Sequence, residues 1–384
     1  MSMRILIFNN GVVCRSGMSG SDRRAIHWAD IFAEKHNVSV VIPGFAKERF
    51  KSVPTHFHTV QKEKPVGLFN YLWRTLLGIM LVIRIRADAY DVVYSTSDLL
   101  PDAIPALVMR WLSPRTRWIT GLHLIAPSPF HGYRQAYQGK FSFPSIKTIY
   151  YHLTQSMITF FMQQFAFLVF VSNENDKRHL LGRNFIENQV LVTYGAPEWE
   201  QIQTVKKNSP EYDVCFIARF HPQKGYDDLL KAWRVVINYK TNARLAIIGD
   251  IPEIILHEKM TGYGIQPDSI TYHGFLDGIE KYTVLSKSKM LAFPSLYESF
   301  GMVAAEAQAC GVPVVAYKLP FYKTVYPKGM AQVPIGDIDA FAEQIIYLIT
   351  HESERQKLAN DAYENATRFD FRQTGYEILR RLEG

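Results

Sequence analysis

The sequence predicts two α/β domains in succession, each a Rossmann-like parallel sheet covered by helices. In the first half, short apolar segments rich in β-branched residues alternate with segments of helical periodicity, as expected for parallel strands joined by helices. After an irregular stretch at residues 194–210 the same alternation starts again, which indicates a second domain of the same kind. The 384 residues, of which 47% are hydrophobic, are enough to bury two cores.

The first domain is expected at residues 1–205. It opens with an apolar strand at 4–8 and a glycine-containing loop at 9–21. A helix follows at 22–35, where apolar residues recur at helical spacing. Further strands are expected in the apolar segments 38–42, 92–95, 118–121 and 168–172.

The second domain is expected at residues 206–365. A helix is expected at 226–239, and strands are expected at 213–218, 243–249, 269–273, 290–293 and 313–316. A final helix is expected from about residue 337 to the end of the chain. Its last part, residues 366–384, is expected to pack back across the first domain.

Composition and the start of the chain exclude several classes of protein. The three cysteines lie far apart and lack metal-binding spacing: Cys14, Cys215 and Cys310. We therefore expect them to be small buried apolar side chains, and expect neither disulfides nor zinc ligands. The first residues run directly into a strand, which predicts a cytoplasmic protein without a secretory signal. No nucleic-acid-binding motif accompanies the basic charge, so we expect no nucleic-acid partner.

The net charge of +7 comes from the first half of the chain. Residues 1–200 hold 22 lysines and arginines against 14 aspartates and glutamates. This excess of positive charge suits an anionic membrane or an acidic ligand, or else is a random distribution of charge without function. Between Arg74 and Arg84 lies a nonpolar run too short for the ~20 residues of a membrane span. Residues 65–86 therefore form either an amphipathic helix lying on a membrane or a half-buried helix of the first domain. Residues 149–171 are interrupted by polar side chains and predict a helix followed by a core strand.

The stretch FPSLYESFGMVAAE at residues 293–306 predicts a ligand site. It lies between a strand end and a helix of small residues, with Ser299 as the expected N-cap. The backbone amides at 301–303 would then lie at the positive end of the helix without intrahelical partners, where a diphosphate binds well. Glu298 and Glu306 lie on either side of this helix end. Because carboxylates only accept hydrogen bonds, they suit the hydroxyls of a sugar and a ribose.

Three segments, in order, resemble the glycosyl transferases of group 1, the retaining GT-B glycosyltransferases of family four. ESFGMVAAEAQACGVPVVA resembles the family's E-x7-E region, and FIARFHPQKGYDDLLKAW its strand followed by arginine and a Lys-Gly turn. HGFLDGIEKYTVLSKSKMLAFPS resembles the stretch that flanks the nucleotide base. The match covers roughly residues 212–320, and the first half is similar only in pattern. The resemblance implies a GT-B fold, in which two Rossmann-like domains with parallel sheets face a central cleft, and sugar transfer from a nucleoside-diphosphate sugar.

The resemblance also implies roles for residues of the second domain. Arg219 and Lys224 match the basic pair that neutralises the donor diphosphate, and fixed cations do stabilise a leaving group that gains negative charge. Glu298 matches the glutamate that binds the donor sugar, and Glu306 the one that binds the ribose. The other donor-binding residues implied are Ser299, Phe300, Gly301, Met302 and Val303 at the helix start, and Phe275 in the loop that contacts the base.

In the first domain the resemblance is looser. Residues 19–22 (SGSD) stand where the family has G-G-x-E, and Gly20 would bring backbone close to the diphosphate or the acceptor. His123 follows the strand at 118–121 and matches the active-site histidine that contacts the donor sugar. The catalytic set implied is His123, Arg219, Lys224 and Glu298.

No cofactor or metal ion is expected beyond the nucleotide sugar itself. A D-x-D sequence, the metal-binding motif of the other major glycosyltransferase fold, occurs at residues 337–339. It directly precedes a helix, so we interpret it as a helix cap.

The acceptor and the donor base are less determined. The aromatic side chains at 126–151 could stack on sugar rings, contact a lipid tail, or pack within their own domain. Together with the basic charge of the first half, they favour a lipid-linked or other glycan acceptor. UDP is expected because it is the commonest carrier in such families. Two alternatives stay open: an inactive nucleotide-binding subunit of a polysaccharide-synthesis complex, and a GT-B nucleotide-sugar epimerase. A dinucleotide oxidoreductase is disfavoured because no G-x-G-x-x-G follows the first strand.

Overall fold

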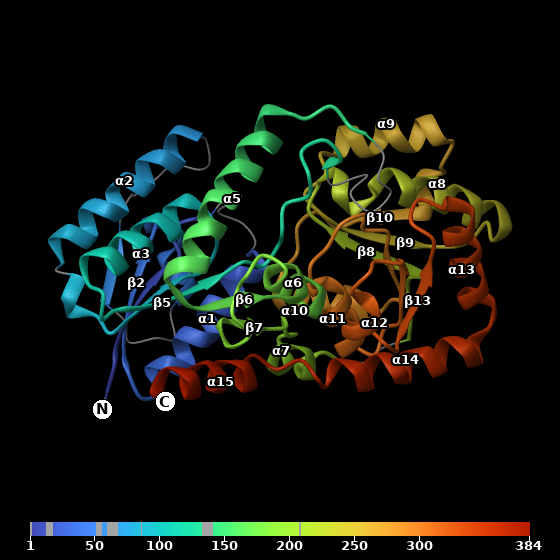
Figure 1. Cartoon of the computed structure of the whole chain (residues 1–384). Coiled ribbons are helices and arrows are strands. Elements are labelled where there is room, and N and C mark those ends of the chain that lie inside the picture. The colour runs from blue at the N-terminus through green and yellow to red at the C-terminus, as the bar shows by residue number, and fades with distance from the viewer. Residues whose placement is uncertain are drawn as a thin grey trace. The chain divides into compact units, whose positions relative to one another are not determined.

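The computed structural model describes residues 2–12, 18–50, 56–59, 68–85, 87–132, 141–206 and 209–384. The chain forms two compact units (Figure 1). Unit 1 comprises residues 1–126, 145–195 and 370–384, and unit 2 comprises residues 127–144 and 196–369. The chain therefore passes into unit 2 at residue 196, before the expected boundary at 205. Cys14 and parts of the segments 65–86 and 126–151 lie outside the described residues.

Unit 1 contains a seven-stranded parallel sheet of order β3-β2-β1-β4-β5-β6-β7. The strands are β1 (Arg4–Phe8), β2 (Asn37–Ile42), β3 (His56–Thr59), β4 (Val92–Ser95), β5 (Arg117–Gly121), β6 (Ala166–Val171) and β7 (Val190–Val192). The five strands that the sequence predicts are confirmed. β3 and β7 were not predicted, because each is too short to show an apolar pattern of its own. The order of strands reverses between β1 and β4.

Helices cover both faces of this sheet. One face carries α1 (Gly20–Ala33) and α15 (Phe371–Glu383), which pack Trp28 and Ile378 into the core. The other carries α2 (Leu68–Arg84), α3 (Leu100–Leu112) and α5 (Ile146–Phe165), and α6 (Glu174–Leu181) follows β6. The helix and strand predicted within 149–171 are confirmed by α5 and β6. Among the described residues, no helix is long and apolar enough to cross a membrane.

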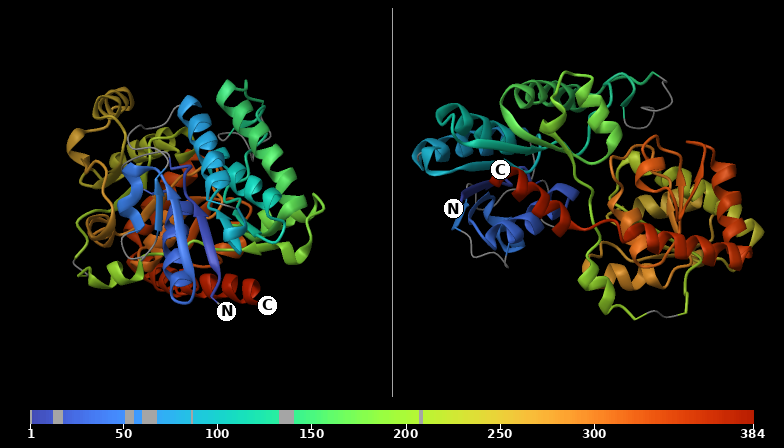
Figure 2. Two further views of the ribbon diagram at one scale, coloured as in Figure 1. Left: turned by 90° about the vertical axis from the view of Figure 1, so that its left-hand side faces the viewer. Right: turned by 60° about the horizontal axis from the view of Figure 1, so that its bottom comes forward.

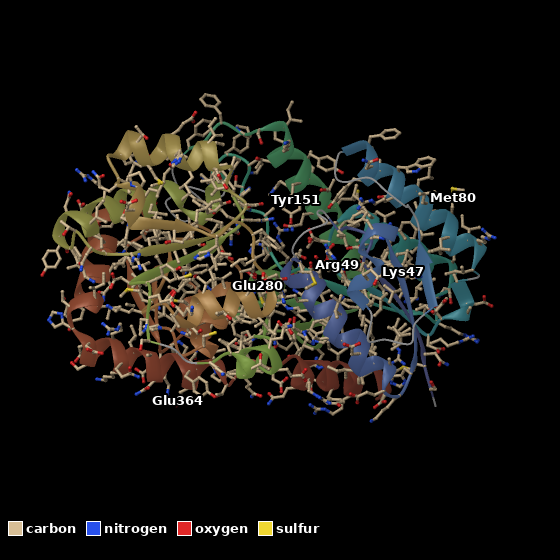
Figure 3. The ribbon with its side chains drawn as sticks, turned by 180° about the vertical axis from the view of Figure 1, so that it is seen from behind. Lys47, Arg49, Met80, Tyr151, Glu280 and Glu364 are labelled. Atoms are coloured by element: carbon tan, nitrogen blue, oxygen red, sulfur yellow. The ribbon has the colours of Figure 1, made fainter. Side chains whose placement is uncertain are left out.

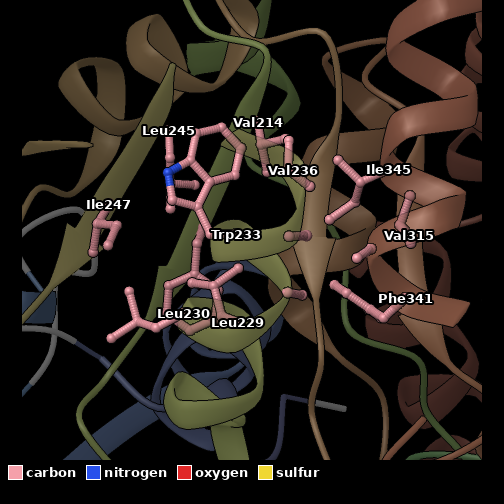
Figure 4. Close-up of a cluster of buried hydrophobic side chains, with 14 of the residues drawn as sticks. Val214, Leu229, Leu230, Trp233, Val236, Leu245, Ile247, Val315, Phe341 and Ile345 are labelled. Atoms are coloured by element: carbon pink, nitrogen blue, oxygen red, sulfur yellow. The ribbon is translucent and has the colours of Figure 1, made fainter. Parts of the chain in front are cut away.

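Unit 2 contains a six-stranded parallel sheet of order β10-β9-β8-β11-β12-β13. Its strands are β8 (Val214–Ala218), β9 (Leu245–Gly249), β10 (Ile270–Tyr272), β11 (Leu291–Phe293), β12 (Val314–Tyr317) and β13 (Met330–Val333). α8 (Tyr226–Tyr239), α9 (Glu253–Tyr263) and α13 (Ile338–Thr350) enclose one core cluster, with Trp233 of α8 at its centre (Figure 4). The remaining helices are α7 (Trp199–Thr204), α10 (Gly278–Ser286), α11 (Met302–Ala309), α12 (Tyr322–Val325) and α14 (Glu352–Ala366). Cys215 and Cys310 are buried free thiols, as expected.

The single final helix expected from residue 337 is wrong. The segment forms α13, α14 and α15, with breaks at His351 and at residues 367–370. The second break arises because the Asp370 side chain accepts a hydrogen bond from the Arg372 amide (2.7 Å) and starts a new helix. Asp337 caps α13 by accepting from the Ala340 amide (3.0 Å), which confirms the interpretation of the D-x-D sequence.

A buried carboxylate joins the loops on the two sides of the strand reversal in unit 1. Asp102 of α3 accepts hydrogen bonds from the backbone amides of Asn10 (2.5 Å) and Gly11 (2.8 Å), which follow β1. It also accepts from the hydroxyl of Ser97 (2.5 Å), which follows β4. Burial raises the pKa of Asp102 to about 7, against the opposing effect of these bonds. Burial also raises the pKa of the neighbouring Asp98 to about 6.

In unit 2, the turn after β8 is fixed against the loop after β11. Lys224 ends a short 3-10 helix (Pro222–Lys224) that is closed by Gly225, whose φ is 71°. The Leu296 amide donates to the carbonyl of Gln223 (2.8 Å). A Cβ on Gly225 would lie 2.1 Å from the carbonyl oxygen of Pro294. Only glycine satisfies both the left-handed backbone and this close approach, so the turn holds Lys224 beside the loop after β11.

We predict that Gly225→Ala destabilises unit 2 much more than Gly264→Ala. Gly264 is also left-handed (φ 64°), but the nearest atom to an added Cβ would be 3.8 Å away. Gly264→Ala should therefore cost only the backbone strain of about 1 kcal/mol, and Gly225→Ala roughly two to three times as much. Thermal unfolding of both variants measures the difference. Equal losses would mean that the approach to Pro294 adds no constraint.

We predict that Asp102 makes the stability of the chain fall as pH rises from 5 to 7. The pKa of Asp102 in the folded chain lies above that of the same carboxyl in the unfolded chain. The stability that the protonated Asp102 contributes is therefore complete below the unfolded pKa and is lost as pH rises through about 7. Between the two pKa values the loss is ~1.4 kcal/mol per pH unit. In Asp102→Asn the amide replaces the protonated carboxyl, so the free energy of unfolding should depend less on pH. The exposed Asp268→Asn variant serves as the control, and a slope unchanged in Asp102→Asn would contradict the prediction.

Candidate functional site

The loops after β8 and β11 bring together most of the predicted residues of the second domain. These strands are neighbours at the point where the strand order of unit 2 reverses, which is where open parallel sheets bind ligands. Arg219 and Lys224 follow β8, and Glu298 and Gly301 follow β11. The carboxyl edge of this sheet therefore combines two cations, a carboxylate and the start of α11.

Lys224 and Glu298 form an ion pair in this edge. Their side chains are only 16% and 10% exposed, and the Lys224 ammonium also lies 5.9 Å from the centre of the Phe293 ring. Arg219 is exposed just beyond the end of β8. The pair fixes Lys224 in place, and the partial burial strengthens its interaction with any anion that binds beside it.

His221 lies between the two cations and stays neutral. Burial and the charges of Arg219 and Lys224 lower the pKa of His221 to about 4. Its side chain accepts a hydrogen bond from the Gln223 amide (3.3 Å), which caps the short helix. The positive charge of this edge thus comes from Arg219 and Lys224 at neutral pH.

The expected N-cap at Ser299 is wrong, because α11 begins two residues later. Gly301 is the N-cap and has a φ of 84°, and its carbonyl accepts from the Tyr326 hydroxyl (2.9 Å). Ser299 is buried upstream of this turn. The sharp left-handed entry into the helix requires glycine, and an added Cβ would also lie 3.2 Å from the Phe293 ring.

The amino end of α11 still exposes amides of the kind that the sequence predicts. The first bond of the helix runs from the Ala304 amide to the Gly301 carbonyl (2.9 Å), so Met302 and Val303 precede it. Their amides therefore lie at the positive end of the helix, where a phosphate binds. Phe300 is different: its ring is buried and packs edge-on against Phe369, with ring centres 5.0 Å apart. Only the backbone of Phe300 is suited to contact a ligand.

Glu306 is held by two residues that the sequence analysis did not identify. It is 2% exposed and accepts from the ammonium of Lys281 (2.9 Å) and from the hydroxyl of Tyr282 (3.3 Å), both on α10. Both bonds are accepted by Oε1, which leaves Oε2 to accept from a ligand. Lys281 was missed because a lysine beside a glutamate on a short helix has the pattern of a solvated surface.

Phe275 lies in the loop after β10, farther along the same edge. It follows Gly274, whose φ is 67° and whose carbonyl accepts a hydrogen bond from the amide of Gly249 (2.9 Å), the last residue of β9. The Phe275 ring is 49% exposed. An aromatic face at the carboxyl edge suits stacking with a planar group.

In unit 1, the SGSD sequence forms a capping box at the start of α1. The Asp22 amide donates to the Ser19 hydroxyl (3.2 Å), and the Ser19 amide donates to the Asp22 carboxylate (2.8 Å). The helix therefore starts at Gly20, earlier than the expected Asp22. Asn9, directly after β1, donates to Asp22 (3.0 Å), so Gly20 lies in the first turn of a helix tied to the carboxyl end of β1.

His123 follows β5 with its ring folded back onto the strand. A Cβ on Gly121 would lie 2.5 Å from its Nε2, so only glycine leaves room for this ring. Its Nδ1 is 3.5 Å from the hydroxyl of Ser172, and Arg24 donates to the same hydroxyl (3.4 Å). Burial and the charge of Arg24 keep the pKa of His123 well below its usual value, so the imidazole is neutral. Among the described residues its Nε2 has no hydrogen-bond partner.

The aromatic stretch after His123 divides between the units. Residues 127–144 belong to unit 2, although the sequence assigned them to the first domain. There Phe130 stacks on Phe141 with ring centres 6.3 Å apart, and Phe143 is 89% exposed. From residue 145 the stretch returns to unit 1 and continues as α5.

Known proteins are similar to this chain in two ways. Residues 197–365 match the family described as glycosyl transferases group 1. An uncharacterized 41.2 kDa protein in the cps region of Klebsiella pneumoniae is 31% identical over 40% of this chain and 43% of its own length. The phosphatidyl-myo-inositol mannosyltransferase of Mycobacterium leprae is 29% identical over 44% of this chain and 46% of its own. The chain thus matches less than half the length of these curated relatives.

The fold is shared over nearly the whole chain. The structure of Alr3699/HepE from Anabaena, solved in complex with UDP and glucose, superposes with a TM-score of 0.76, covering 99% of both chains at 19% identity. The two parallel sheets with their surrounding helices are therefore those of the GT-B fold, as the sequence predicts. The match to the glycosyl transferases of group 1 lies within unit 2, in a chain that has the GT-B fold.

Proposed function

We propose that this chain is a retaining glycosyltransferase that moves a hexose-type sugar from a nucleoside-diphosphate sugar to a hydroxyl acceptor. The observation that carries this proposal is the carboxyl edge of unit 2, which combines Arg219, the Lys224–Glu298 ion pair and the amino end of α11. UDP is the proposed carrier, and the relative solved with UDP and glucose supports this choice. The mannosyltransferase relative supports an acceptor that is lipid-linked or a glycan, in cell-envelope polysaccharide or glycolipid synthesis.

The diphosphate would bind to the cations and the helix start. Arg219, Lys224 and the amides of residues 302 and 303 lie where the charge of a departing diphosphate is best stabilised. The bond from the anomeric carbon to the phosphate oxygen breaks, and the acceptor oxygen bonds to the same face of that carbon. The acceptor proton passes to the departing phosphate oxygen. No covalent nucleophile of the protein takes part, so binding and orientation supply the rate enhancement.

The carboxylates would bind hydroxyls of the donor. Glu298, held by Lys224, accepts from the sugar, and Oε2 of Glu306 accepts from the ribose. His123, kept neutral, would contact the sugar without adding charge. Gly20 supplies backbone amide at the start of α1, and Phe275 contacts the base.

We propose that the reaction needs no metal ion. Two fixed cations and a helix dipole supply the charge that a metal would otherwise bring to the diphosphate. The Asp337 carboxylate is used to cap α13. We also propose that the chain works at the cytoplasmic face of a membrane.

We predict that one nucleotide class stabilises the wild-type chain and that this effect depends on Lys224. At a concentration 100 times its dissociation constant, a ligand adds ~2.7 kcal/mol of stability. Thermal unfolding with UDP, GDP and ADP and with their sugar conjugates should give a shift for one base. The shift should be lost in Lys224→Ala and in Arg219→Ala, and retained in the exposed control Lys357→Ala.

Each variant is compared with its own ligand-free unfolding temperature. This matters because Lys224→Ala leaves the Glu298 carboxylate without its partner and lowers stability by itself. Arg219 is exposed, so its variant reports binding without that complication. The absence of a shift with every nucleotide would contradict an active donor site and favour the inactive subunit.

We predict that Glu306→Gln removes the preference for ribose. A hydrogen bond from a hydroxyl to a buried carboxylate contributes about 1.5–3 kcal/mol, so the wild type should bind the selected nucleotide at least about tenfold tighter than its 2′-deoxy analogue. Isothermal titration should show this ratio approach one in Glu306→Gln and stay unchanged in the exposed control Glu258→Gln. A ratio retained in Glu306→Gln would place the ribose elsewhere.

A further inference from the structure

Helix α2 presents a continuous apolar stripe to solvent. Its exposed members recur at spacings of three and four residues, so they lie on one side of the helix. They are 42% to 77% exposed and comprise Phe69, Leu72, Trp73, Leu76, Met80 and Ile83. Met80 is labelled on α2 in Figure 3.

The opposite side of α2 is already packed. Arg74 is fully buried and donates to the carbonyl of Val12 (2.8 Å), and Val82 is buried in the core beneath the sheet. Most contacts of α2 are made with α3. The exposed stripe is therefore a second apolar face that this unit does not cover.

Helix α5 has a stripe of the same kind. Ile146, Ile149, Leu153, Met157 and Phe160 also recur at helical spacing and are exposed, whereas Ile158 and Met162 on the inner side are buried. α3 packs against both α2 and α5, and the three helices lie side by side on one face of the sheet (Figure 2). Trp111 and Leu112 at the end of α3 are exposed between them. Soluble monomers rarely expose apolar surface on this scale.

Charge identifies the partner that this surface fits. α2 and α5 contain no aspartate or glutamate, and the exposed cations Arg84, Arg115 and Lys147 lie at the ends of the three helices. An apolar, aromatic-containing stripe with basic ends is the pattern of a helix lying in the interface of an anionic bilayer. A second copy of this chain fits less well, because α2 and α5 themselves offer no acidic side chain to pair with these cations across a two-fold interface.

We propose that α2 and α5, with the end of α3, form a surface that docks on anionic phospholipid membranes. The stripes enter the acyl boundary while the cations contact lipid phosphates, and the helices lie in the plane of the membrane. This membrane surface extends the proposed function by naming a partner. It does not depend on the nucleotide site.

The test is sedimentation of the full chain with vesicles of phosphatidylcholine alone or with about a quarter of phosphatidylglycerol. The wild type should bind the anionic vesicles more tightly. A variant with Leu76→Glu and Met80→Glu should bind them at least about tenfold more weakly. Arg84→Gln and Lys147→Gln should each reduce binding about fivefold, with no effect on phosphatidylcholine vesicles. Ile254→Glu, a similarly exposed apolar residue on α9 of unit 2, should bind as the wild type does.

Circular dichroism and nucleotide-dependent unfolding of the same proteins separate the outcomes. The Leu76/Met80 variant should keep its fold and its nucleotide response, so lost lipid binding is then a property of the surface alone. Failure of the wild type to bind either vesicle, or unchanged binding by this variant, would overturn the proposal. It would also be overturned if the wild type were a dimer that this variant converts to a monomer, since a second copy would then cover the surface.

Discussion

The close approach of Gly225 to the carbonyl of Pro294 is the constraint on which the candidate donor site depends. The two residues follow β8 and β11, which are adjacent where the strand order of unit 2 reverses. Any side chain at residue 225 would separate the loops and move Lys224 away from Glu298. The ion pair is therefore a consequence of backbone packing, and the cation is in place before a ligand arrives. Such preorganisation lets fixed charges act on a leaving diphosphate without a cost of rearrangement.

The two units use the same topology with different electrostatics. In both, polar residues gather at the carboxyl ends of the strands beside the reversal. In unit 1 the central group is Asp102, a carboxylate without a cation among its bonded partners, whose pKa burial raises to about 7. In unit 2 the carboxylates Glu298 and Glu306 are each paired with a lysine. At this edge unit 1 therefore has a carboxylate whose ionisation burial opposes and a neutral His123 beside Arg24, whereas unit 2 has two lysine–glutamate pairs, an arrangement suited to a diphosphate.

Continuous apolar segments such as 92–95 and 214–218 were predictable, because strands buried on both faces have no other pattern. The short strands β3, β7 and β13 lacked that signal, and the breaks between α13, α14 and α15 were missed although Asp370 is of a residue type that caps helices. At the site, the resemblance identified Arg219, Lys224, Glu298 and Glu306. Capping propensity placed the N-cap at Ser299, because it favours serine where the actual turn needs a left-handed glycine at Gly301. Lys281 was not predicted, since its role arises from the packing of α10 against α11 and leaves no local pattern.

The placement of α15 in unit 1 has a consequence for the order in which the chain becomes structured during synthesis. Unit 2 is nearly continuous, from residue 196 to 369, whereas unit 1 needs residues from both ends of the chain. Trp28 lies in a core cluster that also needs Ile378, Leu379 and Leu382, so this cluster stays incomplete until residues 378–382 have left the ribosome. Because domains acquire structure as their residues emerge, unit 2 is complete while one side of unit 1 is still open. Loss of residues 370–384 would thus leave unit 2 intact and expose an apolar face on unit 1, a substrate for chaperones and proteases.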